Sequence, residues 1–452
     1  MAELGALLPR MLTAPPGPRS RELAARLARV ESRNVTWLGE RFPVFWEEAR
    51  GANVRDADGN VYLDLTGAFG VALVGHAHPR VEAALREQAG RLVHGMGDLH
   101  PPAVKVPLME RLAGLSPWPD GRVVLASTGS EAVEIALKTA LLATGRSGIL
   151  AFEGGYHGLT LGSLAVTARS YFRRPFQDRI FEGVAFAPFP DPRAGEAGST
   201  EALDAVGRAL ERGAPGGHPI GAVIVEPVQG RAGVRVPPPG FLLALGERAR
   251  AHGCLVVADE VLTGMGRTGH LFASVAAGLV PDLVCVGKAL GGGLPVSACL
   301  GPAGVMDAWP PSPGEALHTS TFLGHPLGCA AALAVLDLLA EGLPARAAEV
   351  GERLKGALAA ALQGAPGVGE VRGAGLLVGV ELAQAPSGAP LSGGASEVAE
   401  AALAEGLLVL PSGELGHVVE LAPSAFLTDD QVEVAVRVLA RVIRGVLEKR
   451  GG

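Results

Sequence analysis

The chain is poor in cysteine, and the few cysteines that it has show no paired spacing. They stand at positions 254, 285, 299 and 329 of the 452 residues. We therefore interpret them as small buried hydrophobic residues of a protein in a reducing compartment. No basic segment followed by a continuous apolar one opens the sequence, so we expect no signal peptide and a cytoplasmic location.

Excess positive charge and long hydrophobic runs are also missing. The formal net charge is −7, which argues against nucleic acid or an anionic membrane as a partner. The longest uncharged runs, 289–306 and 316–336, are broken by Gly, Pro and His, and are poor candidates for membrane spans. With 48% hydrophobic and 19% charged residues the chain is not disordered. It is long enough to form the hydrophobic cores of two or three domains.

Lysine is scarce, with residues at positions 105, 138, 288, 355 and 449. We expect four of them to lie on exposed helix faces or in a tail. Lys288 alone follows an apolar run and precedes a glycine-rich segment, where the backbone can approach a ligand closely. An amine that loses hydration in such a place has a lowered pKa and becomes a nucleophile for carbonyl groups.

Two short apolar runs, 254–258 and 283–286, predict buried strands of a parallel sheet. The first ends in Asp259-Glu260 and the second in Gly287-Lys288. Because ligands of open α/β sheets bind at the carboxyl ends of the strands, an acid and a lysine reach the same edge. A Schiff-base lysine with a carboxylate for a pyridinium nitrogen is typical of pyridoxal phosphate chemistry. This pair alone leaves open an ordinary surface lysine that happens to follow a strand.

Three further segments carry smaller signals. Residues 122–145 predict a strand, a Ser-Thr-Gly-Ser turn and a helix whose first amides could bind a phosphate, although an ordinary helix cap fits equally well. Residues 44–65 contain an Asp-Gly turn typical of a hairpin. His76 and His78 stand close together, but no carboxylate or cysteine joins them at ligand spacing, so we expect no metal.

The runs DEVLTGMGRTG, 259–269, and PDLVCVGKALGGGLP, 281–295, resemble the class III aminotransferases, fold-type I enzymes that use pyridoxal 5'-phosphate. The resemblance covers roughly residues 20–445. It implies an α/β fold with a large domain around a mostly parallel, seven-stranded type of sheet, plus a small α/β domain. We expect an N-terminal arm and part of the small domain at 1–74, the large cofactor-binding domain at 75–335, and the C-terminal small domain at 336–452. In this family, arms such as residues 1–30 often pack on a partner subunit, and we expect a homodimer or a higher homo-oligomer.

The resemblance also implies roles for single residues. Lys288 would form the Schiff base and move the substrate proton, and Asp259 would keep the pyridine nitrogen protonated. The backbone at Gly129 and Ser130 would hold the phosphate, and Tyr156 would stack on the pyridine ring. The remaining residues of the implied cofactor site are His157, Glu226, Val261 and Thr321, the last of which would reach the phosphate in the neighbouring subunit.

The chain departs from the family at two arginine positions that bind carboxylates in enzymes acting on 4-aminobutyrate. Leu159 and Glu420 stand there instead, and with Phe69 they form our predicted substrate residues. Either Glu226 and Glu420 make a pocket that favours cations, or Glu420 turns away and another arginine, such as Arg372 or Arg235, holds the carboxylate.

Three classes of function remain open from the sequence. We expect an aminotransferase that moves an amino group from an amine or amino acid to an oxo acid or aldehyde through a Lys288 aldimine, and that is not a typical 4-aminobutyrate enzyme. A racemase, epimerase or aminomutase on the same scaffold is the alternative, because it needs no carbonyl acceptor. A binding protein without catalysis is the third class, although Lys288 and Asp259 are both present.

Overall fold

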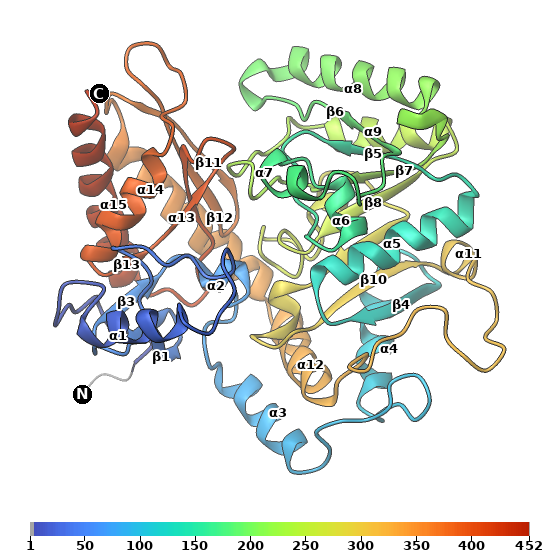
Figure 1. The fold of residues 1–452 in the computed structure, drawn as a ribbon, viewed down its shortest axis with the longest axis horizontal. Helices are drawn as coiled ribbons and strands as arrows, with labels where there is room; N and C mark the ends of the chain where they lie inside the picture. The colour runs from blue at the N-terminus through green and yellow to red at the C-terminus, as the bar shows by residue number, and fades with distance from the viewer. Residues whose placement is uncertain (1–3, 452) are drawn as a thin grey trace. The chain divides into compact units, whose positions relative to one another are not determined.

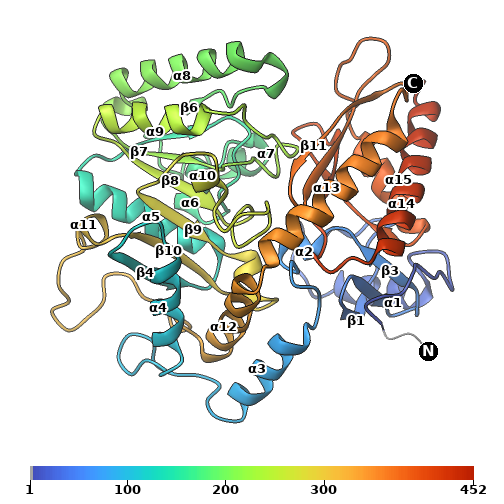
Figure 2. The same ribbon diagram turned by 180° about the vertical axis from the view of Figure 1, so that it is seen from behind.

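Two compact units make up the chain in the computed structural model, which describes residues 4–451 (Figures 1 and 2). The first unit combines the chain up to His78 with the chain from Glu349 onward, and the second is Pro79–Ala348. A long helix, α13, Leu343–Leu362, spans the second boundary in the sequence.

The second unit is built on a seven-stranded sheet with the order β4-β10-β9-β8-β7-β5-β6. Only β10 runs antiparallel to its neighbours, so the sheet is mostly parallel, as the fold class predicts. Both expected strands are present, and they are parallel neighbours with Asp259 opposite Cys285. The strands are β4 Gly121–Ala126, β5 Gly148–Phe152, β6 Val184–Ala187, β7 Ile220–Val225, β8 Leu255–Glu260, β9 Leu283–Val286 and β10 Ser297–Pro302.

Helices cover both faces of this sheet because side chains alternate along each buried strand. In β7, Ala222 and Ile224 pack in the cluster that contains α5 and α6, whereas Val223 and Val225 pack in the cluster that contains α8 and α9. The helices are α3 Pro79–Ala89, α4 Lys105–Leu115, α5 Gly129–Thr144, α6 Leu161–Val166, α7 Ser170–Arg173, α8 Gly195–Arg212, α9 Phe241–Ala251, α10 Ala273–Ala276, α11 Ala303–Met306 and α12 Pro326–Ala340. Short 3-10 turns are η1 Arg174–Phe176, η2 Pro192–Ala194, η3 Pro215–Gly217 and η4 Lys288–Gly291.

The first unit contains two four-stranded sheets, in the orders β1-β2-β3-β13 and β11-β12-β15-β14. The predicted hairpin is present as β2 and β3, with Gly59 at a φ of 86° in the turn. The closing helix is capped by Thr428 and Gln431, which exchange hydrogen bonds across its first turn. The elements are α1 Pro18–Leu27, β1 Trp46–Arg50, β2 Asn53–Asp56, β3 Val61–Asp64, α2 Gly67–Gly70, β11 Val368–Ala374, β12 Leu377–Leu382, α14 Gly394–Ala404, β13 Leu407–Leu408, β14 Leu410–Ser412, β15 Val418–Leu421 and α15 Asp429–Lys449.

The N-terminal arm is fixed to its own unit. The side-chain oxygen of Asn53 accepts hydrogen bonds from the amides of Gly5 and Leu7 at 3.1 and 2.9 Å. That of Asn60 accepts from Leu12 and Thr13 at 2.7 and 2.9 Å. The start of the arm therefore closes a buried polar network on the hairpin of its own unit.

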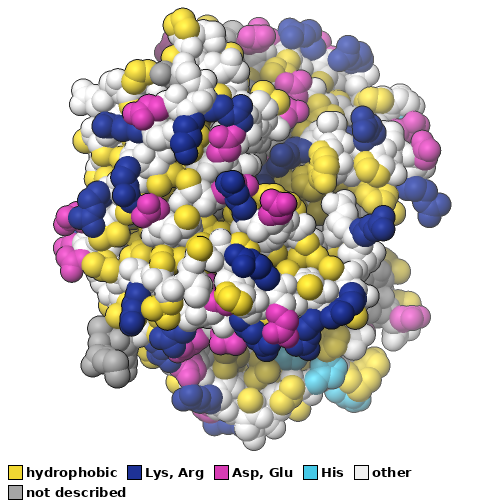
Figure 3. All heavy atoms as spheres, turned by 60° about the vertical axis from the view of Figure 1, so that its left-hand side comes forward, with side chains coloured by type: hydrophobic (Ala, Val, Ile, Leu, Met, Phe, Trp, Pro, Cys, Tyr) yellow, Lys and Arg dark blue, Asp and Glu magenta, His cyan; other side chains and the backbone are white. Residues whose placement is uncertain are grey.

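No single helix among residues 4–451 is long and apolar enough to cross a membrane. Only when α12 and α13, bent by 70° at their junction, are taken together do length and composition reach those of a membrane span. On the face in Figure 3, acidic and basic side chains are interspersed with apolar ones. All four cysteines are buried thiols, as the sequence predicts.

Candidate active site

A pocket of about 530 Å³ opens in the second unit where the parallel strands end. Its lining residues follow or end β4, β5, β7, β8 and β9, which brings Asp259 and Lys288 to one cavity. This is the edge at which open α/β sheets bind ligands. The lining comprises Thr128, Gly129, Ser130, Tyr156, His157, Gly158, Leu159, Thr160, Glu226, Arg231, Asp259, Val261, Leu262 and Lys288.

Asp259, at the end of β8, is held by hydrogen bonds at both carboxylate oxygens. One of its oxygens lies 2.7 Å from Nδ1 of His157, and the other accepts the amide of Val261 at 3.1 Å. Burial disfavours the charged imidazole, but the hydrogen bond and charge of Asp259, together with the charge of Glu226, outweigh burial and raise the pKa of His157. The pair is therefore a buried carboxylate–imidazole contact at the wall of the pocket.

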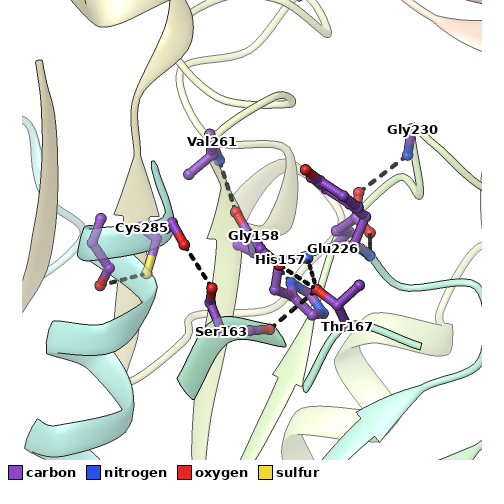
Figure 4. A network of polar contacts seen from close by, with 12 residues as sticks. His157, Gly158, Ser163, Thr167, Glu226, Gly230, Val261 and Cys285 are labelled. Atoms are coloured by element: carbon purple, nitrogen blue, oxygen red, sulfur yellow. Dashed lines mark hydrogen bonds and ion pairs between the residues drawn. The ribbon is translucent and has the colours of Figure 1, made fainter. Parts of the chain in front are cut away.

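His157 is itself positioned by the loop that follows β5. Its amide donates to the hydroxyl of Thr167 at 2.9 Å, and that hydroxyl donates to the carbonyl of Gly158 at 3.0 Å (Figure 4). The ring nitrogen Nε2 is buried and has no hydrogen-bond partner among the described residues. A buried polar atom without a partner is uncommon in proteins, and a catalytic role or a bound water are two of its recognised explanations.

Glu226 follows β7 and is buried beside Asp259. Its two oxygens accept the amides of Tyr156 at 2.9 Å and Gly230 at 3.2 Å (Figure 4). Burial, with the nearby charge of Asp259, raises the pKa of Glu226 to about 7. Two carboxyl groups at this edge thus have different character, because one has a histidine partner and the other does not.

The third acid, Glu260, does not line the pocket. Its oxygens accept the hydroxyl of Thr263 at 2.5 Å and both the amide and hydroxyl of Ser274 at 2.7 Å. Burial raises its pKa. Of the Asp259-Glu260 pair at the end of β8, the first faces the cavity and the second holds the following loop to α10.

The N-terminus of α5 forms another wall of the pocket. Thr128 caps the helix by accepting the amide of Glu131 at 3.1 Å, and its carbonyl accepts the hydroxyl of Ser297 at 2.6 Å. A Cβ atom at Gly129 would lie 2.7 Å from Val261, so only glycine lets the helix approach that closely. The first amides of the helix therefore face the cavity, where an anion is favoured.

Hydroxyl groups gather at the same end of α5. Oγ of Ser130 lies 2.8 Å from the hydroxyl of Thr160 and 2.6 Å from that of Ser163. A side chain at Gly158, where φ is 123°, would collide with this cluster. The arrangement supplies several donors beside the helix terminus, as a phosphate group requires.

Lys288 stands directly after β9 with a φ of 39°, a left-handed conformation that is uncommon outside glycine. Strained backbone of this kind costs about 1–3 kcal/mol and clusters at active sites. Of the other lysines, Lys138 and Lys449 are exposed, as expected. Lys355 is half-buried, so the expectation of exposure is wrong for it. The expectation of exposure is also wrong for Lys105, whose amine donates to the carbonyl of Gly97 at 2.8 Å and whose pKa is lowered by burial.

Three predicted residues lie outside this pocket. Thr321 belongs to the same unit but is exposed and does not line the cavity. Phe69, 64% exposed with a φ of 62°, and Glu420, buried on β15 between Gly379 and Leu410, belong to the first unit. Phe69 and Glu420 therefore belong to a different unit from Lys288, whereas Thr321 shares its unit but does not line the pocket.

The two arginines expected as replacements for the missing carboxylate clamp have other partners. Arg372, in the first unit, pairs with Glu381 and, at 3.1 Å, with Glu370. Arg235 donates to the carbonyl of Phe189 at 2.8 Å and lies over its ring at 5.5 Å. Sequence reasoning overlooked a third arginine, Arg231, which lines the pocket.

A second oversight concerns the histidines before α3. Nε2 of His76 lies 2.8 Å from Asp64, so a carboxylate does join it, from β3. Spacing along the sequence hid this contact because the intervening chain folds back. No group of three or more His, Cys, Asp or Glu residues that could hold a metal ion occurs within residues 4–451.

The sequence profile described as "Aminotransferase class-III" matches residues 37–443. The chain belongs to the class III aminotransferases. Enzymes of this family use pyridoxal 5'-phosphate, and the pocket fits that cofactor: Asp259 suits a pyridine nitrogen, the α5 terminus with its hydroxyls suits a phosphate, and Lys288 suits an aldehyde.

Individual aminotransferases and one racemase align over nearly the whole chain. An acetylornithine aminotransferase from Methanothermobacter thermautotrophicus is 37% identical, over 92% of this chain and 98% of that protein. A 4-aminobutyrate aminotransferase from Mycobacterium leprae is 35% identical, over 96% and 98%. An alanine/serine racemase from Pyrococcus horikoshii is 32% identical, over 97% and 93%. A solved amine transaminase from an uncultivated Pseudomonas species, in its PLP-bound form, is 30% identical with a TM-score of 0.84, over 93% of this aminotransferase and 98% of that chain.

Proposed function

We propose that this class III aminotransferase transfers an amino group from an amino acid or amine to an oxo acid or aldehyde, with Lys288 as the residue that binds the cofactor and moves the proton. The observation that supports this most strongly is the single pocket that contains Lys288, Asp259 and the N-terminus of α5. Pyridoxal 5'-phosphate, when bound, supplies an electron sink for the carbon that bears the amine.

The residues of the chain divide the remaining work. Nζ of Lys288 takes the proton from the substrate carbon as a general base and returns it as a general acid. Asp259, held in place by His157 and the Val261 amide, would be the carboxylate that keeps a proton on a ring nitrogen of the cofactor. Gly129, Ser130 and their helix terminus would bind the phosphate of the cofactor, and Tyr156 would provide an aromatic face for its ring.

Reduction with borohydride followed by peptide mapping tests the role of Lys288. We expect the cofactor to be found on the peptide that contains Lys288. A label on Lys105, which is half-buried in the same unit, would show that the assignment is wrong.

The racemase alternative is supported by the relative from Pyrococcus horikoshii, which is an alanine/serine racemase. The two functions separate when the enzyme is incubated with a single amino acid in deuterated water, first without and then with an oxo acid. An aminotransferase gives net amino transfer only when the acceptor is present. A racemase exchanges the α-hydrogen and inverts the amino acid through many turnovers without any acceptor.

We also propose that two copies of the chain complete each site, with Thr321 reaching the phosphate in the other copy. Thr321 is exposed, and Leu317 and Phe322 near it are exposed at 68% and 58%. Apolar exposure of this kind is typical of an interface. Mixing Lys288→Ala with Thr321→Ala after unfolding and refolding them together should restore activity above either variant, because one site in each mixed dimer is intact. Sedimentation as a monomer would contradict the proposal.

For the substrate, we propose that 4-aminobutyrate with 2-oxoglutarate is a poor pair, and that donors with a distal neutral or cationic group are preferred. The support is chemical: Leu159, 49% exposed at the pocket, offers no charge to a distal carboxylate, and Glu420 replaces the second arginine. Steady-state assays with 4-aminobutyrate, ornithine, lysine and putrescine test this preference. A kcat/KM for 4-aminobutyrate well above the other three would refute it.

A further inference from the structure

We infer that Arg231 is the residue of this chain that binds the carboxylate of the substrate, so that the enzyme favours carboxylate-bearing donors over the matching amines. The inference rests on the proposed function, because it concerns the same pocket. Arg231 lines that pocket together with Lys288, Leu159 and Tyr156. It is a half-buried side chain, so its guanidinium is partly desolvated and its attraction for an anion is strengthened.

Electrostatics give a second, independent indication of where the Arg231 charge acts. Burial raises the pKa of the Tyr156 hydroxyl, and the positive charge of Arg231 is the largest effect that opposes it. A carboxylate bound beside the Tyr156 ring therefore lies within the field of Arg231. The charge of Arg169 acts on Tyr156 less strongly. Arg169 lies over the Phe172 ring at 5.6 Å and does not line the pocket.

The backbone that carries Arg231 is fixed before any substrate arrives. The amide of Gly230 donates to Glu226, and the amides of Gly233 and Val234 both return to the carbonyl of Gly230 at 2.9 and 3.0 Å. Gln229 and Arg235 close the turn with a pair of main-chain hydrogen bonds. A Cβ atom at Gly230 would lie 2.2 Å from Leu262, another pocket residue, so the turn packs directly on the wall of the cavity.

A rigid turn with an arginine at the pocket suits a planar carboxylate. The guanidinium can donate two parallel hydrogen bonds, and a preformed turn reduces the entropy lost on binding. Arg231 thus supplies a carboxylate partner next to the reacting amine, which is a separate requirement from the distal clamp that is absent at Leu159 and Glu420.

Ornithine and putrescine form a matched test, because they differ by one carboxylate. The experiment measures single-turnover conversion of the bound cofactor by each donor, with the wild-type enzyme and with Arg231→Gln. The measured quantity is the ratio of the single-turnover rate constant to the dissociation constant of the donor. In the variant we expect this ratio to fall by about 10- to 100-fold for ornithine and by less than about threefold for putrescine. Arg231→Lys should recover part of the loss, because it keeps the charge without the planar donor pair.

Arg169→Gln is the control, since it removes a charge that acts on the same tyrosine from outside the pocket lining. It should leave the ratio of ornithine to putrescine unchanged. An equal loss for both donors, or an unchanged ratio in Arg231→Gln, would overturn the inference. Cofactor absorbance and borohydride trapping on Lys288 are measured in each variant, so that failure of the proposed aminotransferase chemistry is seen separately from failure of carboxylate selection.

Discussion

Of the buried polar networks among residues 4–451, one lies on the hairpin of the first unit and another at the strand ends of the second. On the hairpin, Asp56 accepts the amides of Asp58 and Asn60 with one oxygen, and Tyr62 and the Asn60 side chain with the other. At the strand ends, Nε2 of His157 has no described partner and the pKa of Glu226 is raised to about 7.

The difference between the networks shows how burial serves two purposes. In the hairpin network, each donor is matched to an acceptor, so burial makes the arrangement unique and stable. In the pocket network, two acids and a histidine are buried together with few hydrogen-bond donors. Burial therefore shifts their pKa values, and Glu226 exchanges its proton near neutral pH. Substitutions should therefore damage folding in the first network and chemistry in the second.

The largest expected effect is that of Lys288→Ala. Turnover should fall by at least about 10³-fold, because the general base of the proposed mechanism is lost. Folding should change little, because alanine adopts the left-handed backbone conformation at this position as readily as lysine does. Steady-state assays with a thermal melt as a parallel measurement test both statements, and substantial residual turnover would move the catalytic role to another residue.

Asp259→Asn should reduce turnover by about 10²-fold or more while cofactor still binds. The carboxamide keeps the shape of the side chain but removes the charge that raises the pKa of His157, so that burial then favours the neutral imidazole. Rapid-mixing kinetics with titration of cofactor binding separate the two effects. Near-wild-type rates would mean that another group holds the proton on the ring.

In the hairpin network, Asp56→Asn should lower the free energy of unfolding by about 3 kcal/mol, because the new NH₂ group faces donors where an oxygen stood. The catalytic rate per folded molecule should stay within about twofold. Tyr62→Phe is the milder control, at about 1 kcal/mol, since it removes one donor and leaves the acid its other partners. Chemical denaturation measures both variants, and equal stability to the wild type would show that the hairpin network is dispensable.

The smallest expected effect is a pH dependence of stability that arises from Glu226. Its pKa rises from 4.5 to about 7 on folding, so the folded protein keeps a proton that the unfolded chain releases. Stability from this group is therefore full below pH 4.5 and falls as the pH rises toward 7, by about 2 kcal/mol between pH 5 and pH 7. The slope should be reduced in Glu226→Gln, in which nothing titrates at this position. A slope identical to that of the wild type would show that other groups cause it.

The sequence predicts some parts of this architecture better than others. The strands that carry the pocket are short β-branched runs, so β7, β8 and β9 follow from composition, and Asp259 and Lys288 follow from their place at the strand ends. By contrast, β10 reads Ser-Ala-Cys-Leu-Gly-Pro, which has no strong strand former, and its antiparallel pairing comes only from its neighbours.

The pocket is less predictable than the sheet because it depends on residues far apart in the sequence. Arg231 stands in a glycine-containing turn that resembles any surface loop, and only folding places its charge near Tyr156. The resemblance to a family suggested Tyr156 and His157, but no local pattern indicates that the imidazole pairs with an aspartate 102 residues away.

The position of β10 also has a consequence for the order in which this protein can fold. In the described sheet β4 is bonded to β10 alone, and Thr128 is held by Ser297, which follows it by 169 residues. During synthesis, the N-terminal end of α5, where we propose that phosphate binds, cannot make this contact until about two thirds of the chain has left the ribosome. Contacts of such high sequence separation slow folding, because a long loop must close before they form. A chain stalled or cleaved before residue 297 would expose an unpaired β4 edge, the kind of surface that chaperones bind and that aggregates recruit.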